Sequence, residues 1–541
     1  MGKGGFILFN RRIPRSAGSL LNGDIASDQS RCGVENQEMR FLFLFVVGFD
    51  ELPLAVAREL QSRYPDATFS GITTLPEWEF NPNRSADAPQ FRPLHKIYEL
   101  ENQWVATPCD RDRLAGYEAM LGPGQLRRIV TADRDLGAGY WPDISWPHSP
   151  LSHLVKDPET LRRYLFGLLD FCFRTLEEVK PDIVFCDPVD NGWKLGLSLV
   201  CRHLGIPFAT LTHARLDNRW IVDDSPENLL SRVRLVFDLA VEDRSIVEPY
   251  LSSAQEYVTR FREKPQAPDT FRMVLEIFDK ERQVRRLMRQ FFNAPRLLAS
   301  LSRKRISIRN PRKLDFLRHR VVETLRSKWL KRCGPFRALG DLPKGPFAYF
   351  PLHFEPEAAT QIAGHLHTNQ VAVIEALTKS LPAEMDLVVK DHAIMLGRRP
   401  LSAYTRLKGI PGVVLASPFE NSLSLIQRAA LTCVITGTAA WEAMLLGRPA
   451  VFIGDSPFFA VGSGFVHCPD LSSLPGAVNR ALAASPADDE RLAIYIAAIL
   501  RESFELEHTL FVEMLNQPKV AAQAESVRAV CDGLLKILHD S

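Results

Sequence analysis

The chain has 541 residues, more than one hydrophobic core usually supports, so we expect two domains and a connector. Hydrophobic residues make up 46% of it and charged residues 24%, which is typical of a folded globular protein and excludes a disordered one. The formal net charge of +2 gives no sign of nucleic-acid binding, and we expect no nucleic-acid partner.

Residues 1–39 show neither helical nor strand periodicity, and we expect a loose leader there. Its short apolar stretch, "FILF", does not provide the hydrophobic segment of a secretory signal. Phe6 stands where a myristoylation signal requires Ser or Thr, so that lipid anchor is not expected either.

An N-terminal Rossmann-like domain is expected over residues 40–250. The apolar run "FLFLFVV" predicts a buried strand, and the stretch after Gly48 has the apolar spacing of a helix. Further along, "IVFCDP" and "PFATLTH" predict two strands separated by a helix that ends at Gly205. Strand, helix and strand in this order predict a right-handed parallel unit. Residues 76–150 have weak periodicity and receive no assignment.

We expect a basic helical connector over residues 251–340. From Arg296 to Arg332 the chain carries thirteen Lys or Arg residues against two acids. Such a run suits a solvated helix face, and it equally suits a site for anionic lipid headgroups or a phosphorylated polymer. We therefore keep an anionic membrane surface as one expected partner of this segment.

Residues 341–515 predict a second Rossmann-like domain, because apolar strands alternate regularly with amphipathic helices: "FAYFPL", "MDLVVK", "GVVLA", "LTCVI" and "PAVFIG" are the expected strands. A C-terminal helix is expected within 516–541. After "FVHCPD" we also expect a helix that returns toward the N-terminal half; "RLAIYIAAILRESFELEHTLF" is the candidate for part of it, although its period equally suits the C-terminal core. The predicted fold is thus α/β, with two Rossmann-like domains facing a cleft and joined by the basic helical connector.

The stretch "VITGTAAWEAMLLG" joins a predicted strand to a predicted helix through Thr436, Gly437 and Thr438. Ligands of open parallel sheets bind beyond the carboxyl ends of the strands, where the next helix offers backbone N–H groups to an anion. Gly437 allows close approach, the threonine hydroxyls add donors, and Glu442 could accept hydrogen bonds from ribose. Alternatively, the threonines cap the helix and Glu442 is a surface residue; this stretch alone favours neither interpretation.

Polar residues follow other strands of the same predicted sheet. His353 and Glu355 come after the first, and His392 and Arg398 after the second. Imidazole and guanidinium groups there could converge on a diphosphate or a carboxylate. Glu420 lies in the loop "SPFENS", which could frame a base. We expect these residues to bind a phosphorylated ligand.

Candidates for a catalytic base lie in the N-terminal half. Asp187 ends one predicted strand and His213 ends the next, although residues at strand ends also hold loops together. Two Asp-x-Asp pairs occur in the unassigned stretch, so we expect no divalent metal at the ligand. These pairs are Asp110 with Asp112 and Asp133 with Asp135.

The stretches "YFPLHFEPEAAT", "LVVKDHAIMLGRRPLSAYTRLKGIPGVVLASPFENS" and "VITGTAAWEAMLLGRPAVFIG" resemble the C-terminal half of the bacterial capsule polysaccharide biosynthesis family. That family includes Kdo transferases of GT-B architecture. In the N-terminal half, "LEEVKPDIVFCDP" and "RHLGIPFATLTHARLDNRW" resemble it more loosely. The resemblance spans roughly Thr160–Ile453.

This resemblance implies a glycosyltransferase with a nucleotide-sugar donor in the C-terminal domain. A glycan or lipid-linked glycan acceptor would lie against the N-terminal domain. His392 corresponds to the histidine of the family's His-Pro motif, although Ala393 replaces the proline. The Thr-Gly-Thr loop with Glu442 corresponds to the donor-binding loop. No cofactor beyond the nucleotide-sugar co-substrate is implied.

Two other classes stay open: a non-hydrolysing nucleotide-sugar 2-epimerase, and a non-catalytic polysaccharide binding or export accessory protein. The nine scattered cysteines without a CxxC pair indicate neither a disulfide framework nor a zinc site, and they suit a reducing cytoplasm. We expect a cytoplasmic protein with peripheral contact at the inner membrane.

Overall fold

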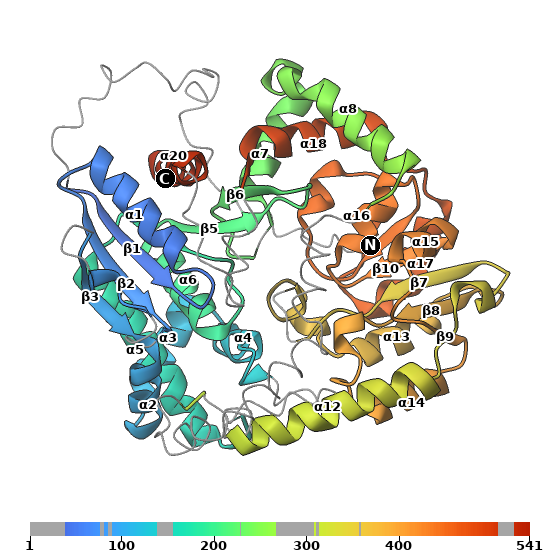
Figure 1. The fold of residues 1–541 in the computed structure, drawn as a ribbon, viewed down its shortest axis with the longest axis horizontal. Helices are drawn as coiled ribbons and strands as arrows, with labels where there is room; N and C mark the ends of the chain where they lie inside the picture. Colours follow the sequence, from blue (N-terminus) through green and yellow to red (C-terminus); the bar gives the residue numbers. More distant parts are fainter. Residues whose placement is uncertain are drawn as a thin grey trace, which may run out of the picture.

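The computed structural model describes two α/β domains built on separate sheets, which lie side by side with helices around each (Figure 1). Most of the predicted leader, 1–37, and most of the segment 296–312 lie outside the residues that it describes. The described residues are 38–75, 80–84, 89–137, 155–227, 229–266, 308–309, 313–355, 359–506 and 524–541.

The sheet of the N-terminal domain runs in the order β13-β6-β5-β4-β1-β2-β3. Strands β1 to β5 are parallel, whereas β6 and β13 are antiparallel at one edge. The parallel part has the doubly wound order, which changes direction between β1 and β4. The strands are β1 (Arg40–Phe45), β2 (Thr68–Thr73), β3 (Phe91–Lys96), β4 (Ile183–Cys186), β5 (Phe208–His213), β6 (Arg219–Asp223) and β13 (Phe504–Glu505).

Helices cover both faces of this sheet, so β1 is apolar at every position but its first. Phe41, Phe43 and Phe45 face the core beneath α1 and α20. Leu42 and Leu44 face the core beneath the helices of the other side. The helices are α1 (Glu51–Arg63), α2 (Ile97–Ala106), α3 (Arg111–Leu121), α4 (Gln125–Ala132), α5 (Pro158–Val179), α6 (Gly192–Leu204) and α20 (Ala524–Asp540). A helix after "FVHCPD" does return to the N-terminal half, namely α20, which packs on α1; the candidate segment for that return forms α18 (Asp489–Glu502) instead.

The second sheet has the order β12-β11-β10-β7-β8-β9 and is parallel throughout. Its direction changes between β7 and β10. This order confirms the predicted α/β class with two Rossmann-like domains. The strands are β7 (Phe347–Pro351), β8 (Asp386–Lys390), β9 (Val413–Ala416), β10 (Leu431–Val434), β11 (Ala450–Phe452) and β12 (Phe465–His467). The helices around them are α13 (Gln370–Thr378), α14 (Leu401–Gly409), α15 (Ser422–Arg428), α16 (Thr438–Leu445) and α17 (Leu474–Ala483).

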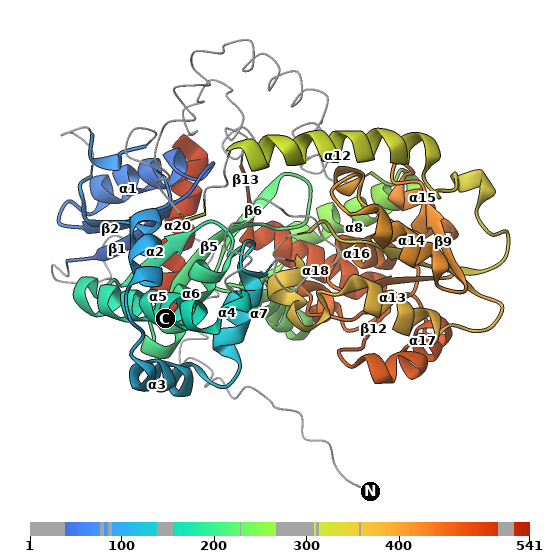
Figure 2. The same cartoon turned by 90° about the horizontal axis from the view of Figure 1, so that it is seen from below.

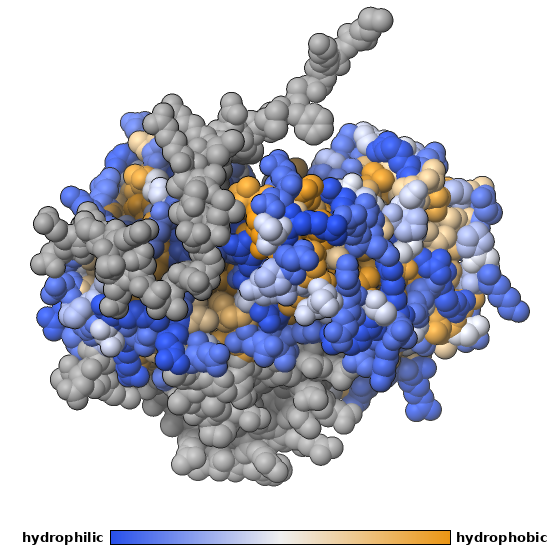
Figure 3. Space-filling model, turned by 90° about the horizontal axis from the view of Figure 1, so that it is seen from above, coloured by the Kyte–Doolittle hydropathy of each residue, from blue (hydrophilic) through white to orange (hydrophobic). Residues whose placement is uncertain are grey.

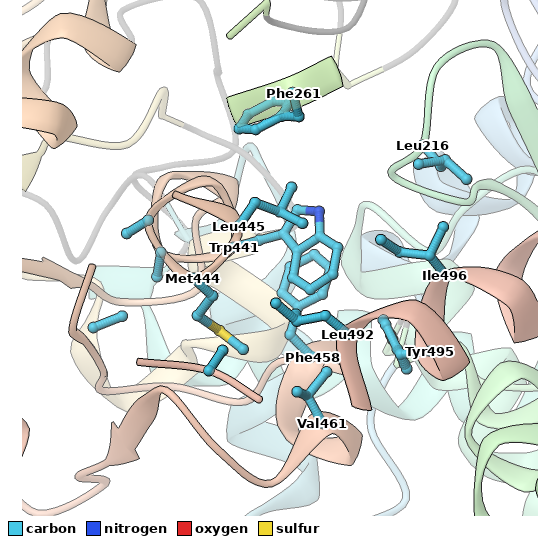
Figure 4. Packing of buried hydrophobic residues seen from close by; sticks show 14 of the residues in the cluster. Leu216, Phe261, Trp441, Met444, Leu445, Phe458, Val461, Leu492, Tyr495 and Ile496 are labelled. Carbon is cyan, nitrogen blue, oxygen red and sulfur yellow. The ribbon is translucent and has the colours of Figure 1, made fainter. Parts of the chain in front are cut away.

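Three helices join the domains: α7 (Ser231–Glu242), α8 (Glu248–Glu263) and α18 (Asp489–Glu502). They share one apolar core with α16, shown in Figure 4. Within it Trp441 stacks on Phe458, with ring centroids 4.6 Å apart and planes at 5°. The predicted boundary between residues 250 and 251 therefore falls inside α8, a helix that packs on α18.

The described end of the connector is α12 (Lys313–Cys333), which runs from the N-terminal domain along the C-terminal domain (Figure 2). Just before it, Arg309 enters the N-terminal domain and forms ion pairs with Glu101, Asp133 and Asp135. Further along, Glu323 of α12 forms an ion pair with the C-terminal domain. The connector is thus held to both domains.

Polar residues cover most of the described surface on the face drawn in Figure 3, with apolar residues showing between them. Among the described helices, none has both the length and the apolar character needed to cross a bilayer.

Candidate functional site

The neighbouring strands β7 and β10 end where the C-terminal sheet changes direction. Beyond β10 the chain passes through Thr436 and Gly437 into α16. Gly437 is the N-cap residue of this helix and has no side chain of its own to cap it. The interpretation that the threonines cap the helix stays an alternative. The first turn of α16 presents its backbone N–H groups at a position that suits an anion.

His353, which follows β7, lies next to Gly437 in this loop. A Cβ atom at Gly437 would be 3.0 Å from its Cε1 and 3.7 Å from its Nε2. The residue is 8% exposed, and its Nε2 has no hydrogen-bond partner among the described residues. Burial, reinforced by Arg399 and His392, lowers the pKa of His353 to about 4. A neutral imidazole with an unpaired Nε2 atom thus lies beside the helix N-terminus, and burial of that atom is unfavourable until a ligand pairs with it.

Buried ion pairs fix the position of His353. The Arg399 Nη2 group donates to the His353 carbonyl oxygen at 2.7 Å. Arg399 also pairs with Glu355 at 3.0 Å and with Asp391 at 3.1 Å, and all three side chains are at most 6% exposed. The Tyr404 hydroxyl donates to Asp391 at 2.6 Å. The Glu355 carboxylate is buried against Arg399, and its role in the ligand site stays a prediction.

His392 stands beside this network at the end of β8. Its Nδ1 accepts a hydrogen bond from the Ile394 N–H at 3.4 Å, which leaves the proton on Nε2. Burial lowers the pKa of His392 to about 4, and Lys390 adds to this shift. His392 is therefore a neutral hydrogen-bond donor at pH 7.

Arg398 lies near His392, because its charge contributes to the lowered pKa of that imidazole, and it also reaches the connector. Its Nε donates to the Glu323 Oε1 atom of α12 at 3.1 Å. Its guanidinium also lies over the Phe354 ring, 5.5 Å from the centroid. This side chain is 4% exposed and holds the connector, and its role at the ligand stays a prediction.

Glu442 and Lys390 form the other side of the site. Burial raises the pKa of Glu442 to about 7, although Lys390 opposes the shift. The Lys390 Nζ group donates to Ser422 Oγ at 3.1 Å. Burial also lowers the pKa of Lys390, although the negative charges of Asp391, Glu442 and Glu420 act to raise it. Glu442 is therefore not the solvated surface residue of the alternative interpretation.

The candidate bases of the N-terminal domain already have partners. The buried Lys194 donates to both carboxylate oxygens of Asp187, at 2.7 and 2.6 Å. His213 accepts from the Arg215 N–H through Nδ1 at 2.9 Å, and its Nε2 lies 2.8 Å from the Asp217 carbonyl oxygen. Both imidazole nitrogens are thus used within one loop. The structure favours a structural role for Asp187 and for His213.

The loop after β7 reaches the N-terminal domain. The Gln361 side chain donates to the Thr131 and Asp133 carbonyl oxygens at 3.3 and 3.4 Å. These residues belong to α4 and its end, and α4 packs on α6, which begins beyond β4. The carboxyl ends of both sheets therefore face the junction between the domains.

Neither Asp-x-Asp pair is arranged around a metal. Asp110 caps α3 by accepting from the Arg113 N–H at 3.0 Å, and Asp133 and Asp135 hold Arg309. The described residues contain no group of three or more His, Cys, Asp or Glu side chains that could bind a metal ion. The expectation of a metal-independent site stays a prediction.

No protein-family model matches the chain, and no curated protein does. Solved structures that match include the beta Kdo 2,7 transferase of Thermosulfurimonas dismutans KpsC, at 10% identity and a TM-score of 0.34, covering 68% of this chain and 89% of that one. Another is the UDP-GlcNAc 2-epimerase of Methanocaldococcus jannaschii, at 11% identity and a TM-score of 0.25, covering 86% and 99%. A third is the glycotransferase of kitacinnamycin, at 14% identity and a TM-score of 0.25, covering 92% and 100%. At these values the likeness carries no argument, and our fold assignment rests on the order of the strands.

Proposed function

We propose that this protein is a glycosyltransferase that moves a sugar from a nucleotide-sugar donor to a surface or capsular polysaccharide or to its lipid-linked precursor. One observation carries the proposal: buried His353, whose Nε2 atom has no hydrogen-bond partner among the described residues, lies against Gly437 at the N-terminus of α16, where the sheet changes direction. This combination suits the phosphate of a nucleotide. The resemblance to capsule polysaccharide biosynthesis proteins supports a sugar as the transferred group.

The same residues suit the departure of a nucleotide. Breaking the bond from sugar to phosphate leaves negative charge on the phosphate, and fixed hydrogen-bond donors there lower the barrier. The first turn of α16 supplies backbone N–H groups, and His353 supplies a neutral imidazole. His392 donates through Nε2 and would oppose the charge that grows during the reaction.

We propose that the acceptor binds at the junction between the two domains, next to this site. The carboxyl ends of both sheets face that junction. Because Asp187 and His213 have internal partners, we assign neither of them as the base that activates the acceptor hydroxyl. An anionic membrane surface remains a proposed partner on the cytoplasmic side, where a lipid-linked acceptor would be met.

A nucleotide-sugar 2-epimerase would use a similar phosphate site without an acceptor. Incubating the full chain with a panel of nucleotide sugars, with and without acceptor glycans, separates the classes. Our proposal predicts transfer that depends on both substrates. A changed sugar in the absence of acceptor would establish the epimerase instead. Binding of glycan without any nucleotide would indicate the accessory protein.

Replacing Glu442 by glutamine should weaken nucleotide binding by about 1.5–3 kcal/mol, because a charge-assisted hydrogen bond to ribose is lost. Since the Glu442 pKa is about 7, the wild-type carboxylate gains its charge as the pH rises through 7. Wild-type affinity should therefore increase over that range, and the variant should lose this part of the dependence. Calorimetric titration with the bound nucleotide from pH 6 to 8 measures both effects.

Glu384→Gln provides a matched control, since Glu384 is an exposed residue before β8, at the opposite end of the strand from the site. It should bind as the wild type does at each pH. If folded Glu442→Gln protein also binds unchanged, Glu442 does not contact the nucleotide.

A further inference from the structure

The connector helix α12 exposes a line of apolar side chains. Val321, Leu325 and Trp329 are spaced four residues apart, so they lie along one face of the helix. They are 51%, 62% and 50% exposed, which is unusual for three large apolar residues in a row. We call these three residues the α12 stripe.

The opposite face of α12 fixes how the helix is turned. Leu330 is buried in the core of the C-terminal domain, and Glu323 is paired with Arg398. Gly397 lies so close that a Cβ there would be 2.4 Å from the Glu323 carbonyl oxygen and 2.8 Å from the Ser327 N atom. Turning the α12 stripe inward would break the ion pair between Glu323 and Arg398 and would separate the helix from Gly397. The stripe therefore stays on the outer face.

Positive charge surrounds the α12 stripe. Arg318, Lys328, Lys331 and Arg332 are exposed on the same helix. Glu323 is the one acidic side chain of α12 that the structure describes, and it is 2% exposed. The exposed charge next to the stripe on this helix is therefore cationic.

The neighbouring loop after β9 extends the apolar surface. Phe419 is 60% exposed, and the Lys331 ammonium lies 5.5 Å from the centroid of its ring. An aromatic side chain beside a lysine is a combination suited to a membrane interface, where the ring meets the acyl boundary and the ammonium meets headgroup phosphates.

We propose that α12 is an interfacial membrane-binding helix, which inserts Val321, Leu325 and Trp329 into the headgroup region of an anionic bilayer. Its lysines and arginines contact the lipid phosphates, and attraction to anionic lipid adds to the burial of apolar area. The positive charge around the α12 stripe favours an anionic lipid surface over an apolar protein as the partner, because cations complement the lipid phosphates. The helix thereby holds the C-terminal domain, to which it is paired, at the membrane.

The test measures partition of the full chain onto phosphatidylcholine vesicles with and without about 30% phosphatidylglycerol. Binding should require the anionic lipid and should weaken as salt is raised. Leu325→Gln together with Trp329→Gln should reduce partition about tenfold, by loss of inserted apolar area. Lys328→Ala should reduce it about fivefold.

Leu235→Gln is the matched control, because Leu235 is 47% exposed on α7, across the molecule from α12 in Figure 1. It should bind vesicles as the wild type does. Thermal unfolding of the doubly substituted protein should stay within a few degrees of wild type, since exposed side chains add little to stability.

Three results would overturn the proposal. One is equal binding to neutral and anionic vesicles, or none. A second is anionic binding that the α12 substitutions leave unchanged. The third is a large fall in unfolding temperature, or in dimer content by sedimentation, on replacing Leu325 and Trp329, which would show that protein covers the stripe.

Discussion

Replacing Arg399 by alanine should destabilise the protein by about 3–5 kcal/mol, because two buried carboxylates would lose their partner. Glu355 is 2% exposed and the Asp391 side chain 1%. Neither can reach water without rearrangement, and the His353 carbonyl oxygen would also lose a donor. Urea unfolding of the variant and the wild type measures the difference.

Arg406→Ala tests whether the effect depends on burial. Arg406 pairs with Glu375 in the same domain, but the two side chains are 46% and 36% exposed. Its loss should cost about 0–1 kcal/mol. Equal losses for the two arginine variants would contradict the role that we give to the buried network.

The second large effect is expected from His392→Ala, which should lower turnover about a hundredfold while changing nucleotide affinity little. The imidazole would act mainly on charge that develops in the transition state. Single-turnover and steady-state kinetics on the donor and acceptor found by the panel measure the effect. Exposed His203, on α6, is the control, and its alanine variant should keep wild-type turnover.

The lowered pKa of His392 adds a pH signature. Because its pKa is about 4, the neutral donor form is already complete at pH 6 and is lost only as the pH falls toward 4. The ratio of wild-type to His392→Ala turnover should therefore be constant from pH 6 to 8. A ratio that changes through pH 6.5 would mean that His392 titrates as an ordinary histidine, and unchanged turnover in the folded variant would remove it from the reaction.

The strands that sequence reasoning found are those with a continuous apolar run, including β9 at an edge of its sheet. Strand β2 was missed although it is buried, because "TFSGIT" is interrupted by Ser and Gly. β3 was missed because it lies at the sheet edge, and "FRPLHK" alternates without an apolar run. The role of α8 was also missed. Its packing partner α18 lies more than two hundred residues away, so no local pattern shows that both belong to one core.

Sequence reasoning identified the residues that are proposed to face the phosphate, but it did not identify the ion pairs that hold them in place. The loop at Gly437 and the strand-end His353 come together as expected from the sheet. The ion pairs of Glu355 and Arg398 were not foreseen, because their partners, Arg399 and Glu323, lie 44 and 75 residues away along the chain. Such pairing depends on the tertiary fold.

Lys390 is the residue of the site that we overlooked. It was included in the predicted strand "MDLVVK" without being assigned a role. A charged residue at the end of a buried strand, two positions before His392, is a signal that could have identified it.

The proposed function requires that a nucleotide phosphate lies between the N-terminus of α16 and His353. Calorimetric titration of Gly437→Ala with the nucleotide of the preferred donor tests this most directly. At Gly437 φ is −69°, so alanine strains no backbone, yet its Cβ would press on the His353 ring at 3.0 Å. Gly409→Ala, where nothing lies within 4 Å of the added Cβ, is the control. We predict affinity about tenfold weaker for Gly437→Ala and unchanged for Gly409→Ala. Equal affinity of both variants and the wild type would contradict the claim.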